Sequence, residues 1–550
     1  MKKLILCAAL AGIIPALRAQ VGDQLVGTTA AVENQPAADE ALFRTHIKAL
    51  SADAFGGRKP LSVHEEPVIN YIAGTFKDLG LEPANGSSYF QEVPLLSVRT
   101  RFKNNEIVVN GSHGTVKLHN MEDAVVWSLR GEKSIKLANT SFVFAGFGIN
   151  APEYGWNDYD GIDVKGKIVI VLVNDPGYYD DALFRGKNMT YYGRWTYKFE
   201  EAGRQGAAGV LIIHDAGPAS YDWSVVQNGR ANDNLSLYSA TGNKELVPIQ
   251  GWVTGKAAET LFAAAGQSSE TAIAAARQKG FKSFALSLKT TLEVLNSAKV
   301  ANSHNVAAIL PGTDLKDEYI IYSAHWDHLG IGTPIDGDSI YNGADDNASG
   351  VSALFLLANR FKKLAERPRR SILFLSVTAE ESGLLGSEYY SLHPIVPLQK
   401  TVVNLNMDGY GNKGRTTSVT LGGAGDAETD RYVIEAAATQ GRIVMPAANQ
   451  TSGGYFRSDH FNFAKVGVPV ILAKGGRDYL DPAAEEAKRI AHPPVYSYHQ
   501  PNDEYHDWWD LSGSLQDIYL FYGIGLRLSN DSSFPRWNEG IPYKAIREGK

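Results

Sequence analysis

The chain has 550 residues, 44% of them hydrophobic, and a formal net charge of -7. At roughly 100–200 residues per domain, two to four domains are expected. This composition excludes a disordered chain, a collagen-like chain and a small disulfide-rich scaffold. The chain has no basic excess that would neutralise phosphates, so no nucleic-acid partner is predicted.

The first residues are typical of a secretory signal peptide. Two lysines precede an apolar run from Leu4 to Leu17, and a small residue, Ala19, follows. This run is shorter than the about 20 residues that span a bilayer. We therefore predict a signal peptide at residues 1–19, a secreted or periplasmic protein, and no membrane association after cleavage.

The single cysteine, Cys7, lies inside this predicted signal peptide. The rest of the chain therefore has no disulfide and no thiolate for catalysis or metal binding. Any metal must be held by His, Asp and Glu side chains.

Hydrophobic periodicity divides the remaining chain. Helices are predicted within residues 41–80, short strands within 85–140, and a distinct block of strands and helices at 141–285. From residue 303, short apolar runs alternate with helical segments such as Val351–Leu364. These runs are Val306–Leu310, Ile320–Ser323, Ile372–Val377, Val402–Asn406 and Val470–Leu472. The alternation predicts an α/β fold with a mixed, largely parallel central sheet and helices on both faces.

Two phosphate-binding patterns occur in the wrong context. Gly146–Ala151 fits a dinucleotide pattern, but Pro152 follows where a helix must begin. Gly161–Lys167 fits a phosphate loop, but Ile168 replaces the hydroxyl residue and the segment leads into a strand. We therefore predict no nucleotide cofactor.

Acidic and histidine side chains follow several of the predicted strands directly. Taken one at a time, they have plainer explanations as solvated loops, helix caps or exposed acidic pairs. The carboxyl ends of parallel strands, however, meet at one edge of a sheet, where α/β proteins bind ligands. Nitrogen and oxygen donors without sulfur suit two zinc ions that share one carboxylate. The predicted ligands are His325, Asp345, Glu381, Asp408 and His499.

With these motifs, residues 303–510 resemble the secreted di-zinc aminopeptidases of the leucyl-aminopeptidase and aminopeptidase Y type. The segment Leu50–Arg58 and the helix after it match more weakly. Phe144–Ile149 and Gly206–Val210 resemble the protease-associated domain that is often inserted in these enzymes. The resemblance implies a zinc-exopeptidase fold with a β-rich α+β insert. The implied divisions are a signal peptide at 1–19, the N-terminal part of the peptidase domain at 20–125, the protease-associated domain at 126–290 and the zinc peptidase domain at 291–550.

The resemblance also implies which residue binds which ion. His325 and Asp408 would bind one zinc, and Glu381 and His499 the other. Asp345 would bridge the two ions, and its peptide bond to the next residue would be cis.

Further roles follow from the same resemblance. Asp327 would hold the His325 ring through its second nitrogen, and Glu380 would be the general base for a hydroxide that bridges the zinc ions. Tyr498 or Tyr455 would stabilise the oxyanion; the sequence leaves both open. The implied activity is removal of N-terminal residues from peptides with a free N-terminus.

Three alternatives stay open. One is a carboxypeptidase of the glutamate-carboxypeptidase type, although Asp346-Asn347-Ala348-Ser349-Gly350 follows Asp345 where that group tends to carry Pro-x-Ser-Gly. Another is a glutaminyl-peptide cyclotransferase that uses a single zinc ion. The third is a binding protein with an inactive peptidase fold, which the complete set of predicted ligands disfavours.

Overall fold

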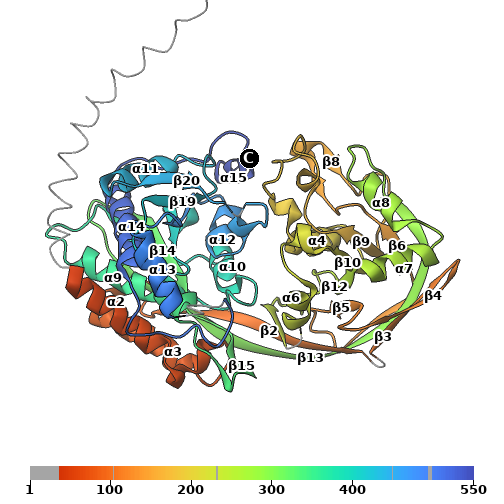
Figure 1. Cartoon of the computed structure of the whole chain (residues 1–550), viewed down its shortest axis with the longest axis horizontal. Coiled ribbons are helices and arrows are strands. Elements are labelled where there is room, and N and C mark those ends of the chain that lie inside the picture. Colours follow the sequence, from red (N-terminus) through yellow and green to blue (C-terminus); the bar gives the residue numbers. More distant parts are fainter. Residues whose placement is uncertain (1–35, 103–104, 231–232, 449, 493–497, 550) are drawn as a thin grey trace, which may run out of the picture.

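The computed structural model describes residues 36–102, 105–230, 233–448, 450–492 and 498–549, so the predicted signal peptide and Cys7 lie outside the described residues. Two lobes lie at opposite ends of a long antiparallel pair, β2 (Phe90–Phe102) and β13 (Phe284–Leu310) (Figure 1). Within the described ranges, no helix combines the length and apolar character needed to cross a membrane.

The lobe that contains both ends of the described chain is built on a mixed sheet with a parallel centre. In spatial order, the parallel strands are β17 (Arg370–Val377), β14 (Leu315–His325), β18 (Thr401–Asn406) and β21 (Val470–Gly475). The end of β13 pairs antiparallel with β17, and β19 (Ser418–Gly422) pairs antiparallel with β21. Every predicted apolar run is therefore a strand of this sheet. Two further strands extend the sheet. Strand β1 (Glu82–Pro83) pairs with β13, and strand β20 (Ile443–Pro446) pairs with β19.

Helices cover both faces of this sheet, as predicted. Successive side chains of a strand point to opposite faces, so the apolar side chains of these strands must be buried on both sides. Ile320 and Tyr322 of β14 pack in one buried cluster, whereas Ile321 packs in another. The first cluster includes residues of α2 (Pro36–Leu50), α3 (Glu65–Asp78), α9 (Gly350–Lys362) and α14 (Ser512–Asn530). The second includes residues of α10 (Leu385–Leu392) and α12 (His460–Lys465), on the side that faces the other lobe (Figure 1).

The second lobe contains four parallel strands among antiparallel ones. The parallel strands, in spatial order, are β6 (Ser134–Phe144), β9 (Ile168–Leu172), β10 (Gly209–His214) and β12 (Ile249–Thr254). The antiparallel strands are β3 (Glu106–Gly111), β4 (Gly114–His119), β5 (Ala124–Trp127) and β11 (Asn234–Leu237). The helices of this lobe are α4 (Trp195–Arg204), α5 (Ala216–Ala219), α6 (Trp223–Asn228), α7 (Gly255–Ala264) and α8 (Ser269–Ala276).

The predicted limits of the insert differ from this arrangement. Strands β3 and β4 precede residue 126 and β5 spans it, yet they pair with β13, with each other or with β12. The limit predicted at 290/291 falls inside β13, which continues from the second lobe into the first. The sequence did not indicate this because a continuous strand has no change of composition where it passes from one lobe to the other.

The remaining elements are short or peripheral. They are β7 (Asn150–Ala151), β8 (Trp156–Asn157), β15 (Gly330–Ile335), β16 (Asp338–Tyr341), α11 (Asp430–Thr439), α13 (Pro482–Ala491) and α15 (Pro542–Arg547).

A buried ion-pair cluster supports helix α14, and it gives a stability prediction. Asp517 contacts Lys413 Nζ at 2.6 Å and Arg442 Nη1 at 2.8 Å. Burial alone would raise the pKa of Asp517, but these cations hold it below its usual value. Removing one member of such a buried pair leaves uncompensated charge, so Asp517→Asn is expected to lower the free energy of unfolding by about 3–5 kcal/mol at neutral pH.

Urea unfolding of the wild type and Asp517→Asn at several pH values tests this prediction. A lowered pKa in the folded state stabilises the protein above the unfolded pKa of about 4 and is lost as the pH falls through the folded pKa. The difference between the two proteins should therefore persist above pH 4 and shrink in stronger acid. Equal stability at neutral pH would contradict the assignment.

Candidate metal centre

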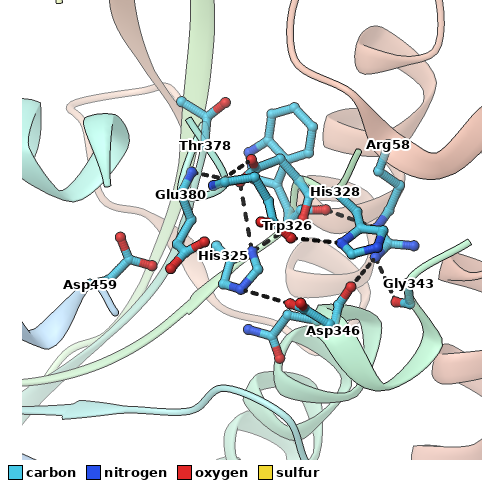
Figure 2. Close-up of polar contacts among 12 residues, drawn as sticks. Arg58, His325, Trp326, His328, Gly343, Asp346, Thr378, Glu380 and Asp459 are labelled. Carbon is cyan, nitrogen blue, oxygen red and sulfur yellow. Dashed lines mark hydrogen bonds and ion pairs between the residues drawn. The ribbon is translucent and has the colours of Figure 1, made fainter. Parts of the chain in front are cut away.

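Three of the five predicted ligands lie at the carboxyl ends of three neighbouring parallel strands. His325 is the last residue of β14, Glu380 and Glu381 follow β17, and Asp408 follows β18. The fold brings these groups together at one edge of the sheet. Figure 2 shows His325 and Glu380 there, together with Asp346 of the segment that precedes α9. The side chain of His325 is only 1% exposed, so this candidate ligand is shielded from solvent.

Asp346 lies between two imidazoles. Its Oδ1 is 3.3 Å from Nε2 of His325, and its Oδ2 is 3.3 Å from Nε2 of His499. Each oxygen of one carboxylate thus faces a different histidine. This is the arrangement expected of a carboxylate shared by two ions.

The prediction that Asp345 occupies this bridging position is therefore corrected to the next residue. The Asp345 carboxylate instead accepts a hydrogen bond from the backbone N–H of Gly411 at 2.5 Å. The cis peptide bond is also one residue further on, between Asp346 and Asn347. Adjacent side chains leave the backbone in different directions, so only one of two neighbouring aspartates can face the histidines, and the sequence alone did not distinguish them.

One half of the centre is formed around His325. Its Nε2 is 3.6 Å from Oδ1 of Asp408, whose Oδ2 accepts a hydrogen bond from Ser458 Oγ at 2.8 Å. Donor atoms of His325, Asp408 and Glu380 all lie within 4.8 Å of one another. This half therefore offers a histidine and two carboxylates to a cation.

The other half is formed around Glu381. His499 Nε2 lies 2.9 Å from Glu381 Oε2, and His328 Nδ1 lies 2.8 Å from Glu381 Oε1. Donor atoms of His328, Asp346 and Glu381 also fall within 4.8 Å of one another. His328 is not among the ligands predicted from the sequence; its position three residues after His325 was the available signal.

Asp327 supports the centre in a different way from the one predicted. The Nδ1 of His325 lies 3.1 Å from the backbone carbonyl oxygen of Asp327 and 3.8 Å from its carboxylate. The carboxylate accepts hydrogen bonds from the backbone N–H groups of Glu380 and Glu381, at 3.0 and 3.3 Å. Asp327 therefore orients the histidine through its main chain and the two glutamates through its side chain.

The two predicted tyrosines have different surroundings. Tyr498 is 68% exposed, and its ring stacks on the His499 imidazole with centroids 3.7 Å apart. The Tyr455 ring meets His460 edge-on at 4.9 Å and packs against the second buried cluster. Stacking on a candidate ligand makes Tyr498 the more suitable of the two for contact with a substrate.

Asp459 is a further carboxylate that the sequence analysis did not assign a role. It is fully buried, and its Oδ1 accepts a hydrogen bond from Ser387 Oγ at 2.6 Å. Its Oδ2 has no hydrogen-bond partner among the described residues, and the side chain lies beside Glu380 (Figure 2). Burial raises the pKa of Asp459 to about 6.

The chemistry of this donor set fits divalent cations. The Nε2 atoms of His325, His328 and His499 are buried and make no well-aligned hydrogen bond within the described part of the chain. Carboxylate oxygens nevertheless lie 3.3 Å from Nε2 of His325 and 2.9 Å from Nε2 of His499. Burial alone would lower the pKa of His499, but the Glu381 and Asp346 carboxylates raise it to about 10. The centre therefore strongly favours positive charge. Because the donors are imidazole nitrogens and carboxylate oxygens, zinc is a suitable ion.

Comparison with known proteins gives the class of the domain that holds this centre. Residues 305–520 match the family model for Peptidase family M28. Aminopeptidase YwaD of Bacillus subtilis (strain 168) is 27% identical over 354 residues, which cover 63% of this chain and 62% of YwaD. Aminopeptidase NAALADL1 of Rattus norvegicus is 37% identical over 122 residues, 21% of this chain and 15% of that protein. The chain thus spans less than two thirds of the length of either curated relative.

A comparison with solved structures aligns most of this chain with an aminopeptidase of known structure. The aminopeptidase from Aneurinibacillus sp. strain AM-1 aligns with a TM-score of 0.49 and 19% identity, covering 91% of this chain and 94% of that chain. From the sequence matches, residues 305–520 are similar to Peptidase family M28, and the chain is homologous to the aminopeptidase YwaD. The family resemblance predicted from the motifs is confirmed.

Proposed function

We propose that this chain is a di-zinc aminopeptidase that removes N-terminal residues from peptides. The observation that carries the proposal is the Asp346 carboxylate, with one oxygen 3.3 Å from each of two imidazole nitrogens. His325 and Asp408 would hold one zinc ion, Glu381 and His499 the other, and Asp346 both. Bound zinc supplies Lewis acidity, which polarises a carbonyl and lowers the pKa of a water molecule.

Glu380 is the proposed general base. Burial raises the pKa of its carboxyl well above the usual value, and the negative charges of Glu381, Asp408 and Asp459 act in the same direction. A carboxylate in this environment accepts the proton of the attacking water at one oxygen and returns it to the leaving amine. The backbone N–H of Glu380 is fixed by Asp327, so the base is held in place.

Tyr498 is the proposed oxyanion donor, through its phenolic hydroxyl. Its exposed position beside His499 leaves the hydroxyl free to meet a substrate carbonyl. The carboxylates of Glu380 and Asp408 would hold the free α-amine, and this contact selects the N-terminal residue of a peptide.

A substrate panel tests the activity. Aminoacyl substrates and peptides with a free N-terminus should be cleaved, whereas N-acetylated peptides should be resistant. Cleavage from the carboxyl terminus would support the carboxypeptidase alternative instead. Cyclisation of an N-terminal Gln peptide with one zinc per chain would support the cyclotransferase alternative.

Metal removal gives a second test. Dialysis against a chelator is expected to abolish hydrolysis, and addition of zinc should restore it in proportion to two ions per chain, as measured by elemental analysis. Full activity of the metal-free protein would contradict the proposal, and saturation at one ion per chain would contradict its di-zinc form.

The second lobe and the N-terminal segment complete the proposal. The second lobe would be a protease-associated domain beside the peptidase domain, and residues 1–19 would direct the protein to the periplasm or the medium. Its peptide substrates would then be extracytoplasmic.

A further inference from the structure

Asp503 contacts the backbone of the segment that carries Asp346. It is 1% exposed, and its two carboxylate oxygens accept hydrogen bonds from consecutive N–H groups: Oδ1 from Asp345 at 2.8 Å and Oδ2 from Asp346 at 3.0 Å. Its own carbonyl oxygen accepts a hydrogen bond from the N–H of Ala344 at 2.9 Å. Asp503 follows the candidate ligand His499 by four residues. One short stretch of chain therefore carries both a candidate ligand and the side chain that binds the backbone N–H groups of Asp345 and Asp346.

Arg58 holds the same segment from the carbonyl side. Its side chain is buried, and it donates hydrogen bonds to the carbonyl oxygens of Asn342 at 2.5 Å and Gly343 at 2.7 Å (Figure 2). It also donates to the carbonyl of Trp326, next to the candidate ligand His325, at 2.8 Å. Arg58 therefore connects the end of β14 to the segment that leads into Asp346.

The two side chains together connect three ligand-bearing segments. Arg58 joins the His325 segment to residues 342–343, and Asp503 joins residues 344–346 to the His499 segment. Both are ionisable side chains, and both are buried. Neither is among the residues whose donor atoms cluster around the candidate ion positions.

We propose that Asp503 and Arg58 are positioning residues that fix the Asp346 carboxylate between two zinc ions and thereby set the affinity for zinc. The inference rests on the proposed di-zinc function. A carboxylate offers two acceptor oxygens and no donor, so it can bind two adjacent N–H groups at once. An amide in the same place would turn its NH₂ group toward one of those N–H groups. The Asp346 main chain would then shift, and the bridging oxygens would shift with it.

The test is a zinc titration of the full-length protein. Metal-free wild type, Asp503→Asn and Arg58→Lys are titrated with zinc against a competing chelator, and folding is verified by circular dichroism. Loss of a group that orients a metal ligand typically weakens metal binding about 10- to 100-fold, and we expect a loss of this size for each variant. Arg58→Lys keeps the charge but cannot reach the separate carbonyls with one ammonium group.

A buried aspartate of the other lobe gives a matched control. Asp158 is 2% exposed and accepts hydrogen bonds from the backbone N–H groups of Phe147 and Ile149. Asp158→Asn should lower the melting temperature and leave the zinc dissociation constant unchanged. A purely structural role for Asp503 would give the same result as this control.

Wild-type zinc affinity in a folded Asp503→Asn or Arg58→Lys variant would overturn the inference. Because there are two variants, the test stays decisive if one of them does not fold. The proposed function is judged separately, by peptide cleavage with the wild type. Wild type that binds two zinc ions and cleaves nothing would contradict the proposed function, while the affinity ratio would still decide the role of Asp503 and Arg58.

Discussion

Glu380→Gln is expected to lower kcat by about 10²- to 10⁴-fold, the usual contribution of a general acid–base group, while both zinc ions stay bound. Glutamine has nearly the same shape as glutamate but cannot accept and return a proton. Glu380 could instead act as a metal ligand, because its donor atom lies within 4.8 Å of those of His325 and Asp408. If the main role of Glu380 were to hold a metal ion, the protein would lose zinc when this residue is replaced.

Zinc content and kcat measured on the same preparation separate these two roles. Retained zinc with a large loss of kcat supports the general base, whereas lost zinc would make Glu380 a ligand. Glu428→Gln is a suitable control, since Glu428 is paired with Arg536 in an exposed position. Near-wild-type turnover of Glu380→Gln would show that the assignment is wrong.

Asp346→Asn is expected to weaken zinc binding by more than about 100-fold, beyond the range seen when only a supporting group is lost. An amide carries no charge and has one acceptor oxygen, so it cannot face both imidazoles as the Asp346 carboxylate does. The neighbouring change Asp345→Asn should be far milder, since the Asp345 carboxylate accepts a hydrogen bond from Gly411 instead. Isothermal titration with zinc measures both variants.

This adjacent pair is informative because both residues have the same chemistry and lie one position apart. Stronger loss of zinc in Asp345→Asn than in Asp346→Asn would restore the bridging role to Asp345. Similar effects in both variants would point to the local fold of the segment rather than to a bridging carboxylate.

The sheet that carries the centre was predictable from the sequence for a simple physical reason. Strands buried on both faces have short, continuous apolar runs, and every such run predicted after residue 303 is a strand. The limits of the second lobe were not predictable in this way. Strand β13 runs through both lobes over 27 residues, so no end of a strand marks the limit between them.

The candidate centre was predictable to the level of residue type and segment. His325, Glu381 and Asp408 converge because the parallel strands end at one edge of the sheet, and His499 reaches them from the loop before α14. The choice between Asp345 and Asp346 depended on backbone direction, which spacing does not give. Arg58 and Asp503 were missed as supports because they act on backbone groups far away in the sequence, and no local pattern marks such contacts.

Anomalous diffraction at the zinc absorption edge would locate the metal ions bound to the crystallised protein. We expect two strong peaks per chain, one beside His325 and Asp408 and the other beside Glu381 and His499, with an oxygen of Asp346 directed at each. A single peak, or peaks bound by other side chains while Asp346 points away, would contradict the proposed di-zinc centre.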